Sequence, residues 1–195
     1  MKVYIYVTKG PKVLAHFGGK YAVRKKGESG LNGKVVASFN LNEIDNYEME
    51  YQNDGTDDCM KRIARISTDQ EGDEQTERVA SNEDEPRDDC DLLKRSCLTF
   101  EGLGKFLFRK GECGWRRFYA WKIDNLEIYA TARNLCDFMN FSADFFYEAP
   151  RSWSYTMGDM NGEGGVILPV RPEWVCRILN GEKTIEIRTT KPRSL

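Results

Sequence analysis

Three side chains that can bind a polar ligand stand close together near the end of the chain. Lys183, Glu186 and Arg188 lie within six residues. Ile185 and Ile187 alternate with the last two, which predicts a strand carrying Glu186 and Arg188 on one face. Lys183 precedes this strand and can reach the same space. Because a buried charge without a partner is costly, we expect these side chains to hold a polar ligand or one another.

The preceding residues predict the elements that position this cluster. Val166–Val170 is apolar and β-branched, which is typical of a strand. Pro172 suits the first position of a helix, and Asn180-Gly181 suits its end, because glycine accepts the left-handed conformation there. The helix would have an apolar face made of Trp174, Val175, Ile178 and Leu179.

The segment Ile167–Arg188 resembles the opening segment of ASCH domains, in the PUA-like superfamily. The family motif, glycine-x-lysine-x-x-glutamate-x-arginine, is met by Gly181, Lys183, Glu186 and Arg188. Residues 2–10, 32–44 and 119–129 resemble barrel strands of phage and bacterial ASCH-like proteins. The resemblance implies an α+β fold, a PUA-like mixed β-barrel with flanking short helices, in one domain over residues 1–195.

The order of the segments differs from that of the family. The motif segment opens the family's domains, whereas it comes last here. We interpret the chain as a circular permutation in which the glycine-rich linker 157–165 joins the usual family termini. A PUA-like barrel can accept such a change if its termini are close and exposed.

Alternating apolar residues predict further strands. Lys2–Thr8 is one strand, and Val13–Phe17 can pair with Lys20–Val23 as a hairpin across two glycines. Residues 34–44 predict one long strand with an apolar face and a face that becomes polar near its end.

The second half of the chain predicts one helix and two strands. Thr99 is the expected N-cap of a helix that runs through Arg109. Phe118–Tyr129 predicts an aromatic strand bent near its middle, and Arg151–Thr156 predicts a short strand. Thr131–Met139 is expected to form a helical turn.

Charge is unevenly distributed along the 195 residues, although the net charge is only −2. Residues 48–95 hold 16 acidic and 7 basic residues, whereas the remainder holds 15 acidic and 22 basic residues. The low hydrophobicity of Ser67–Asp89 predicts a mobile acidic insertion over 48–95, with one short helix near Asp58–Ile66. A basic body favours an anionic partner such as a nucleic acid or a nucleotide.

The superfamily resemblance implies binding of RNA, DNA or a modified nucleotide, and the candidate residues suit that task. Arg188 can grip a phosphate or a base edge, and Glu186 can accept a hydrogen bond from an exocyclic amine. Lys183 and Lys9 can neutralise phosphate. Aromatic residues that could stack on a base are Tyr119, Trp121 and Trp153.

A structural alternative accounts for the same residues without a ligand. Glu186 and Arg188 could simply pair with each other along the strand. Trp121 and Trp153 could simply fill the core. The sequence leaves this alternative open.

Two other functions stay open at this stage. Some ASCH-family proteins are amidohydrolases acting on acetylated cytidine, and the resemblance then implies catalytic roles for Lys183, Thr184 and Glu186. The family's threonine lies where Glu186 stands, and its separate glutamate has only Glu43 as a match. The other function is a protein-interaction or inhibitor module, encoded by a phage, that engages a protein partner through the acidic insertion or through a face of the barrel.

Composition excludes several classes of protein. No apolar run approaches the roughly 20 residues of a membrane helix, so we expect no membrane partner and a cytoplasmic location. The six cysteines form no CxxC pair, and His16 is the only histidine. We therefore expect free thiols, no metal and no cofactor, and the sequence leaves the oligomeric state open.

Overall fold

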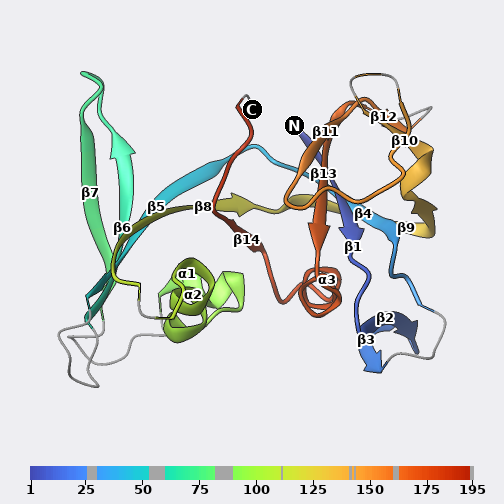
Figure 1. Cartoon of the computed structure of the whole chain (residues 1–195), viewed down its shortest axis with the longest axis horizontal. Coiled ribbons are helices and arrows are strands. Elements are labelled where there is room, and N and C mark those ends of the chain that lie inside the picture. Colours follow the sequence, from blue (N-terminus) through green and yellow to red (C-terminus); the bar gives the residue numbers. More distant parts are fainter. Residues whose placement is uncertain are drawn as a thin grey trace. The chain divides into compact units, whose positions relative to one another are not determined.

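The chain forms two compact units (Figure 1). The first comprises Met1–Asn42 and Ile123–Lys183, and the second comprises Glu43–Lys122 and Thr184–Leu195. The structure, a computed structural model, describes residues 1–25, 30–52, 60–81, 90–110, 112–140, 142, 144–159 and 163–193. Strands predominate there beside three short α-helices, which confirms the α+β class. The expectation of one ASCH/PUA-like domain over residues 1–195 stays a prediction beside this division into two units.

A five-stranded mixed sheet forms the centre of the first unit. Its order is β11 (Ser154–Thr156), β13 (Gly165–Val170), β1 (Lys2–Val7), β4 (Lys34–Asn40) and β9 (Asp124–Asn134). Strand β1 runs parallel to β13 and antiparallel to β4. Its residues from Val3 to Val7 are all buried, as expected of a central strand covered on both faces.

A hairpin and a helix pack together in the first unit. The predicted hairpin is confirmed as β2 (Lys12–Phe17) and β3 (Lys20–Lys25). Helix α3 (Pro172–Leu179) packs against both strands. The side chain of Asn180 fixes the helix end, because its Oδ1 accepts from the Tyr21 N–H at 3.2 Å and its Nδ2 donates to the Tyr21 carbonyl at 3.0 Å.

Residues 131–165 of the first unit differ from the expectation. Strand β9 continues to Asn134, and only Leu135–Asp137 is helical, as a 3-10 turn. Phe138–Met139 (β10) then pairs with Gly158–Asp159 (β12). The expected linker 157–165 thus contributes to two strands, although its residues 160–162 lie outside the described part.

The second unit contains the other five-stranded sheet, in which every neighbouring pair is antiparallel. Its order is β14 (Ile185–Arg188), β8 (Gly114–Lys122), β5 (Ile44–Gln52), β6 (Met60–Thr68) and β7 (Glu74–Ser81). Figure 1 shows β6 and β7 turning away from the line of β5 and β8.

Two long strands that the sequence predicted are each divided between the sheets. The strand expected over 34–44 becomes β4 and the start of β5, and both faces of β4 are buried rather than one. The strand expected over 118–129 becomes β8 and β9, separated at Ile123, with Asn125 in the left-handed region at φ 49°. Polar residues stand at each division, Asn42-Glu43 in the first case and Asp124-Asn125 in the second. The sequence analysis interpreted them as the polar end of one strand and as a bend in the other.

The described residues of the segment 48–95 lie in regular elements, although its composition suggested a mobile insertion. Its described residues include most of β5, all of β6 and β7, and helix α1 (Asp91–Ser96). The helix expected near Asp58–Ile66 is wrong, because Met60–Thr68 is a strand that pairs with β5 on one side and β7 on the other. Residues 53–59 and 82–89 lie outside the described part.

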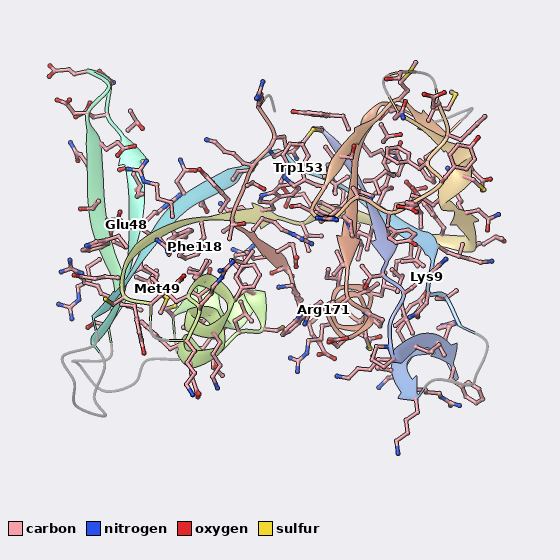
Figure 2. The ribbon with its side chains drawn as sticks, in the orientation of Figure 1. Lys9, Glu48, Met49, Phe118, Trp153 and Arg171 are labelled. Carbon is pink, nitrogen blue, oxygen red and sulfur yellow. The ribbon has the colours of Figure 1, made fainter. Side chains whose placement is uncertain are left out.

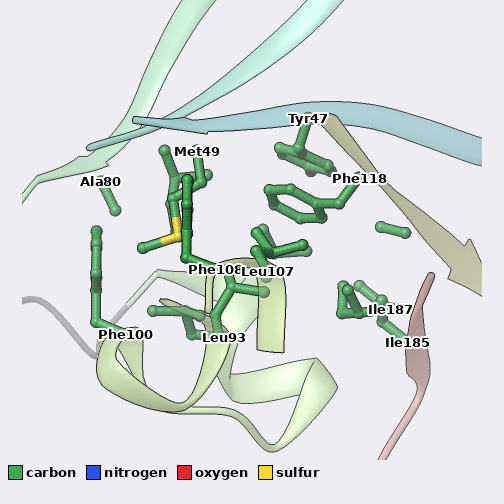
Figure 3. Packing of buried hydrophobic residues seen from close by; sticks show 14 residues of the cluster. Tyr47, Met49, Ala80, Leu93, Phe100, Leu107, Phe108, Phe118, Ile185 and Ile187 are labelled. Carbon is green, nitrogen blue, oxygen red and sulfur yellow. The ribbon is translucent and has the colours of Figure 1, made fainter. Parts of the chain in front are cut away.

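Helices α1 and α2 (Phe100–Leu107) cover one face of the second sheet (Figure 3). Thr99 is confirmed as the N-cap of α2, because its hydroxyl accepts from the Gly102 N–H at 3.0 Å. The helix ends at Leu107 rather than at Arg109. Beneath it, the rings of Tyr47 and Phe118 stack with centroids 5.4 Å apart, so the sheet and helices share one core.

Replacing Gly165 should destabilise the first unit. A Cβ atom there would lie 2.1 Å from the Lys2 carbonyl oxygen, in the ladder that joins β13 to β1. We expect Gly165→Ala to lower the free energy of unfolding by roughly 3 kcal/mol, measured by urea denaturation. Gly164→Ala is the matched control, because its Cβ meets backbone no closer than 3.4 Å. Equal effects of the two substitutions would contradict this packing.

Tyr47 should make the protein less stable at alkaline pH. Burial, with the nearby Asp45 charge, raises the pKa of Tyr47 from 10.0 to about 12. Between these values the unfolded chain has lost this proton and the folded protein has kept it, so the free energy of unfolding falls as pH rises. We expect Tyr47→Phe to gain stability relative to wild type over this interval. A difference between the two proteins that does not change with pH would contradict the assignment.

Candidate functional site

The predicted strand at the end of the chain is present as β14. It pairs antiparallel with β8, so that Arg188 lies opposite Tyr119 and Glu186 opposite Trp121. Ile185 and Ile187 enter the core beneath the helices. Glu186 and Arg188 therefore lie on the other face of the sheet, as the alternation predicted.

Glu186 and Arg188 form an ion pair with each other. Arg188 Nη2 lies 2.9 Å from Glu186 Oε1, and their side chains are 16% and 9% exposed respectively. The pairing that the structural alternative anticipated thus exists. It also fixes the direction of the Arg188 guanidinium, which has five N–H donors to distribute.

Lys183 belongs to the first unit, whereas Thr184 begins the second. The Lys183 ammonium is buried, with Nζ 5.3 Å from the centroid of the Trp174 ring on α3. Thr184 is held within the second unit by Arg95, whose Nε donates to the threonine hydroxyl at 3.1 Å. Lys183 therefore has its described contacts in the first unit, whereas Glu186 and Arg188 have theirs in the second.

The remaining candidates have different settings. Trp121 is fully buried and fills the core, so no base can stack on its ring. Trp153, in the first unit, packs edge-on against Tyr155 with centroids 5.3 Å apart. Lys9 is exposed in the same unit (Figure 2). Glu43, in the second unit, forms an ion pair with Lys122 at 2.7 Å.

The structure reveals a surface of which the sequence interpretation had named only Tyr119 and Arg188. On β8, Trp115, Arg117 and Tyr119 alternate with residues that face the helices, so they share the face that carries Arg188. Arg62 on β6 lies on the same face. It is directly opposite Glu50 on β5, and Glu50 is directly opposite Trp115 on β8, so all three side chains point to one side of the sheet. We call this surface the arginine face, made of Arg62, Trp115, Arg117, Tyr119 and Arg188.

Carboxylates lie beneath the guanidinium groups on this face. Arg62 Nη2 is 3.1 Å from Glu50 Oε2, and the arginine side chain is 40% exposed while the glutamate is 6% exposed. In the Glu186–Arg188 pair the arginine side chain is likewise more exposed than the glutamate. The buried acids orient the arginines, and a guanidinium carries five N–H donors in a fixed, planar arrangement.

An ion pair crosses the arginine face. Arg117 on β8 donates to both carboxylate oxygens of Glu74 on β7, at 3.0 and 2.5 Å. Strands β5 and β6 lie between these two strands in the sheet, so the pair spans several strands. Its hydrogen bonds raise the pKa of Arg117.

Trp115 supplies an accessible aromatic surface at this site. Its side chain is 45% exposed, and the Arg62 guanidinium lies 5.3 Å from its ring centroid. Arginine favours the π-electron face of tryptophan. The arginine face therefore combines an exposed ring with oriented cations, whereas Trp121 on the same strand is buried.

Neither a metal site nor a membrane-spanning helix is present among the residues that the structure describes. Within the described ranges, no group of three or more His, Cys, Asp or Glu side chains could hold a metal ion. No helix there is long and apolar enough to cross a membrane. Comparisons with family models, curated proteins and solved structures found no match to this chain.

Substitution of the two tryptophans of β8 should have unequal effects on stability, because Trp121 is in the core and Trp115 is on the surface. We expect Trp121→Ala to lower the free energy of unfolding by about 3–5 kcal/mol, because it removes a fully buried ring. Trp115→Ala should cost about 1 kcal/mol, mainly the contact with Arg62. Urea denaturation measures both values. A small loss for Trp121→Ala would contradict its assignment to the core.

Proposed function

We propose that the second unit binds a single strand of RNA or DNA across the arginine face. The observation that carries this proposal is the layering of charge, in which partly exposed Arg62 lies over buried Glu50 and beside exposed Trp115. Oriented cations next to an accessible ring are the two components that single-strand binding needs.

Each part of the site has a defined role in this proposal. The guanidinium groups of Arg62 and Arg117, which Glu50 and Glu74 orient, bind phosphate oxygens. Trp115 stacks on one base, an interaction that every base can make because each has a π-face.

The charge of the second unit is compatible with an anionic ligand. In its described part, 15 residues are basic and 13 are acidic. Much of the acid of the segment 48–95 falls instead in residues 53–59 and 82–89 of the sequence. The strands themselves thus carry slightly more base than acid, which supports binding to phosphate.

The family and fold assignments also belong to this proposal. The chain order of β13, α3 and β14, with Gly181 at φ 77° ending the helix, supports an ASCH-like segment. The PUA-like mixed barrel and the circular permutation are proposed on the same basis. The five described cysteines are free thiols, which supports a location in the cytoplasm.

The amidohydrolase and protein-interaction alternatives have less support. For hydrolysis, the Thr184 hydroxyl already accepts a hydrogen bond from Arg95. For an interaction module, half of the 16 acidic residues of the segment 48–95 lie outside the described part. Both remain predictions from the sequence.

Binding to labelled oligonucleotides tests the proposal. The full chain is titrated against fluorescent 12-nucleotide single strands of RNA and DNA, with fluorescence anisotropy as the readout. Trp115→Ala should weaken binding by roughly 5- to 150-fold, since stacking on one base is worth roughly 1–3 kcal/mol. Arg117→Ala should weaken it and reduce its dependence on salt.

The controls are matched residues of the first unit. Phe17→Ala removes another exposed ring, which is 66% exposed, and Arg151→Ala removes another exposed arginine. Both controls should bind as wild type does. The proposal fails if Trp115→Ala and Arg117→Ala also bind like wild type, or if the affinity is independent of salt.

A further inference from the structure

A second candidate site lies on the other side of the same sheet. A cavity of about 1050 Å³ opens at the end of α2, and its lining includes Tyr51 and Arg116 from β5 and β8. Arg116 lies opposite Met49, which is in the core beneath the helices, so the cavity is on the helix side. Its volume is that of a small-molecule site.

The lining of this cavity carries an excess of positive charge. It has four basic residues and two acidic ones, and each acid already has a partner. Glu101 pairs with Lys105 at 2.5 Å, and Glu112 pairs with Arg116 at 3.4 Å. Arg109 and Lys110 are exposed, and neither has an ion-pair partner among the residues that the structure describes.

A short turn holds the two remaining cations at the rim. The Arg109 N–H donates to Glu112 Oε2 at 3.0 Å, and the Glu112 N–H donates to the Arg109 carbonyl at 3.0 Å. The hydrogen bond from Arg109 lowers the pKa of Glu112, which therefore stays ionised. Basic residues are expected near a helix C-terminus for electrostatic reasons alone, so these charges need a second observation.

Two aromatic rings of the cavity, one buried and one exposed, are the second observation that points to a ligand. The ring of Phe108 is enclosed by Tyr51, with centroids 5.4 Å apart, and by the Arg116 guanidinium at 5.7 Å. Phe106 lines the same cavity and is 51% exposed. A large apolar side chain left open to solvent beside two cations suits a ligand that has both a ring and an anionic group.

We propose that this cavity binds a nucleoside monophosphate. Arg109 and Lys110 bind the phosphate, and Phe106 contacts the face of the base. The site is separate from the arginine face, because the two lie on opposite sides of the sheet. It does not depend on the proposed binding of a nucleic-acid strand.

Calorimetric titration of the full chain with AMP, GMP, CMP and UMP tests this site. Joint substitution of Arg109→Glu and Lys110→Glu should weaken binding roughly 100-fold or more, because it removes two charge-assisted contacts. Phe106→Ala should weaken it by roughly 5- to 150-fold. The matched control is Lys20→Glu with Lys25→Glu, two exposed lysines of the first unit, which should bind as wild type does.

Ligand fragments and the arginine-face variant complete the test. Adenosine lacks the phosphate and ribose 5-phosphate lacks the base, so both should bind much more weakly than AMP. Trp115→Ala should leave AMP binding unchanged, which separates this site from the proposed strand-binding surface. The proposal is overturned if no nucleotide binds at millimolar concentration, if either fragment binds as tightly as AMP, or if the Arg109/Lys110 variant retains wild-type affinity.

Discussion

The core and the candidate site of the second unit both depend on the antiparallel pairing of β14 with β8. Alternation along these strands sends Ile185, Ile187 and Phe118 into the core beneath the helices. The same alternation sends Arg188 and Tyr119 to the opposite face. A shift of one residue in this register would exchange the two sets, so the apolar core fixes which charged side chains form the arginine face.

Burial of carboxylates is the second constraint on this sheet. Glu50 and Glu186 are nearly buried, and each requires a cation to offset its loss of hydration. Arginine meets this need while keeping donors for a further partner. The Glu50–Arg62 pair therefore stabilises the acid and also leaves the arginine side chain 40% exposed, so one arrangement serves both the stability of the unit and its proposed binding of phosphate.

Local signals in the sequence predicted local structure well. The Thr99 cap, the end of α3 at Gly181 and the alternation around Glu186 each depend on neighbouring residues, and all three are present. The strands of 48–81 were missed because their stability comes from distant partners such as Met49 with Ile63. The many charged residues of these strands suggested an insertion, whereas Glu50, Arg65 and Glu74 form ion pairs with residues on other strands of the sheet. The alternation of Trp115 and Arg117 was readable, but the expected strand began too late to include it.

The indole signals of the four tryptophans offer the most direct test of the arginine face. In a nitrogen–proton correlation spectrum, each Nε1–H gives a separate resonance that substitution assigns. Titration with a thymidine oligonucleotide should shift the Trp115 signal strongly and leave those of Trp153 and Trp174, in the first unit, nearly unchanged. Shifts at Trp153 or Trp174 without a shift at Trp115 would contradict the account.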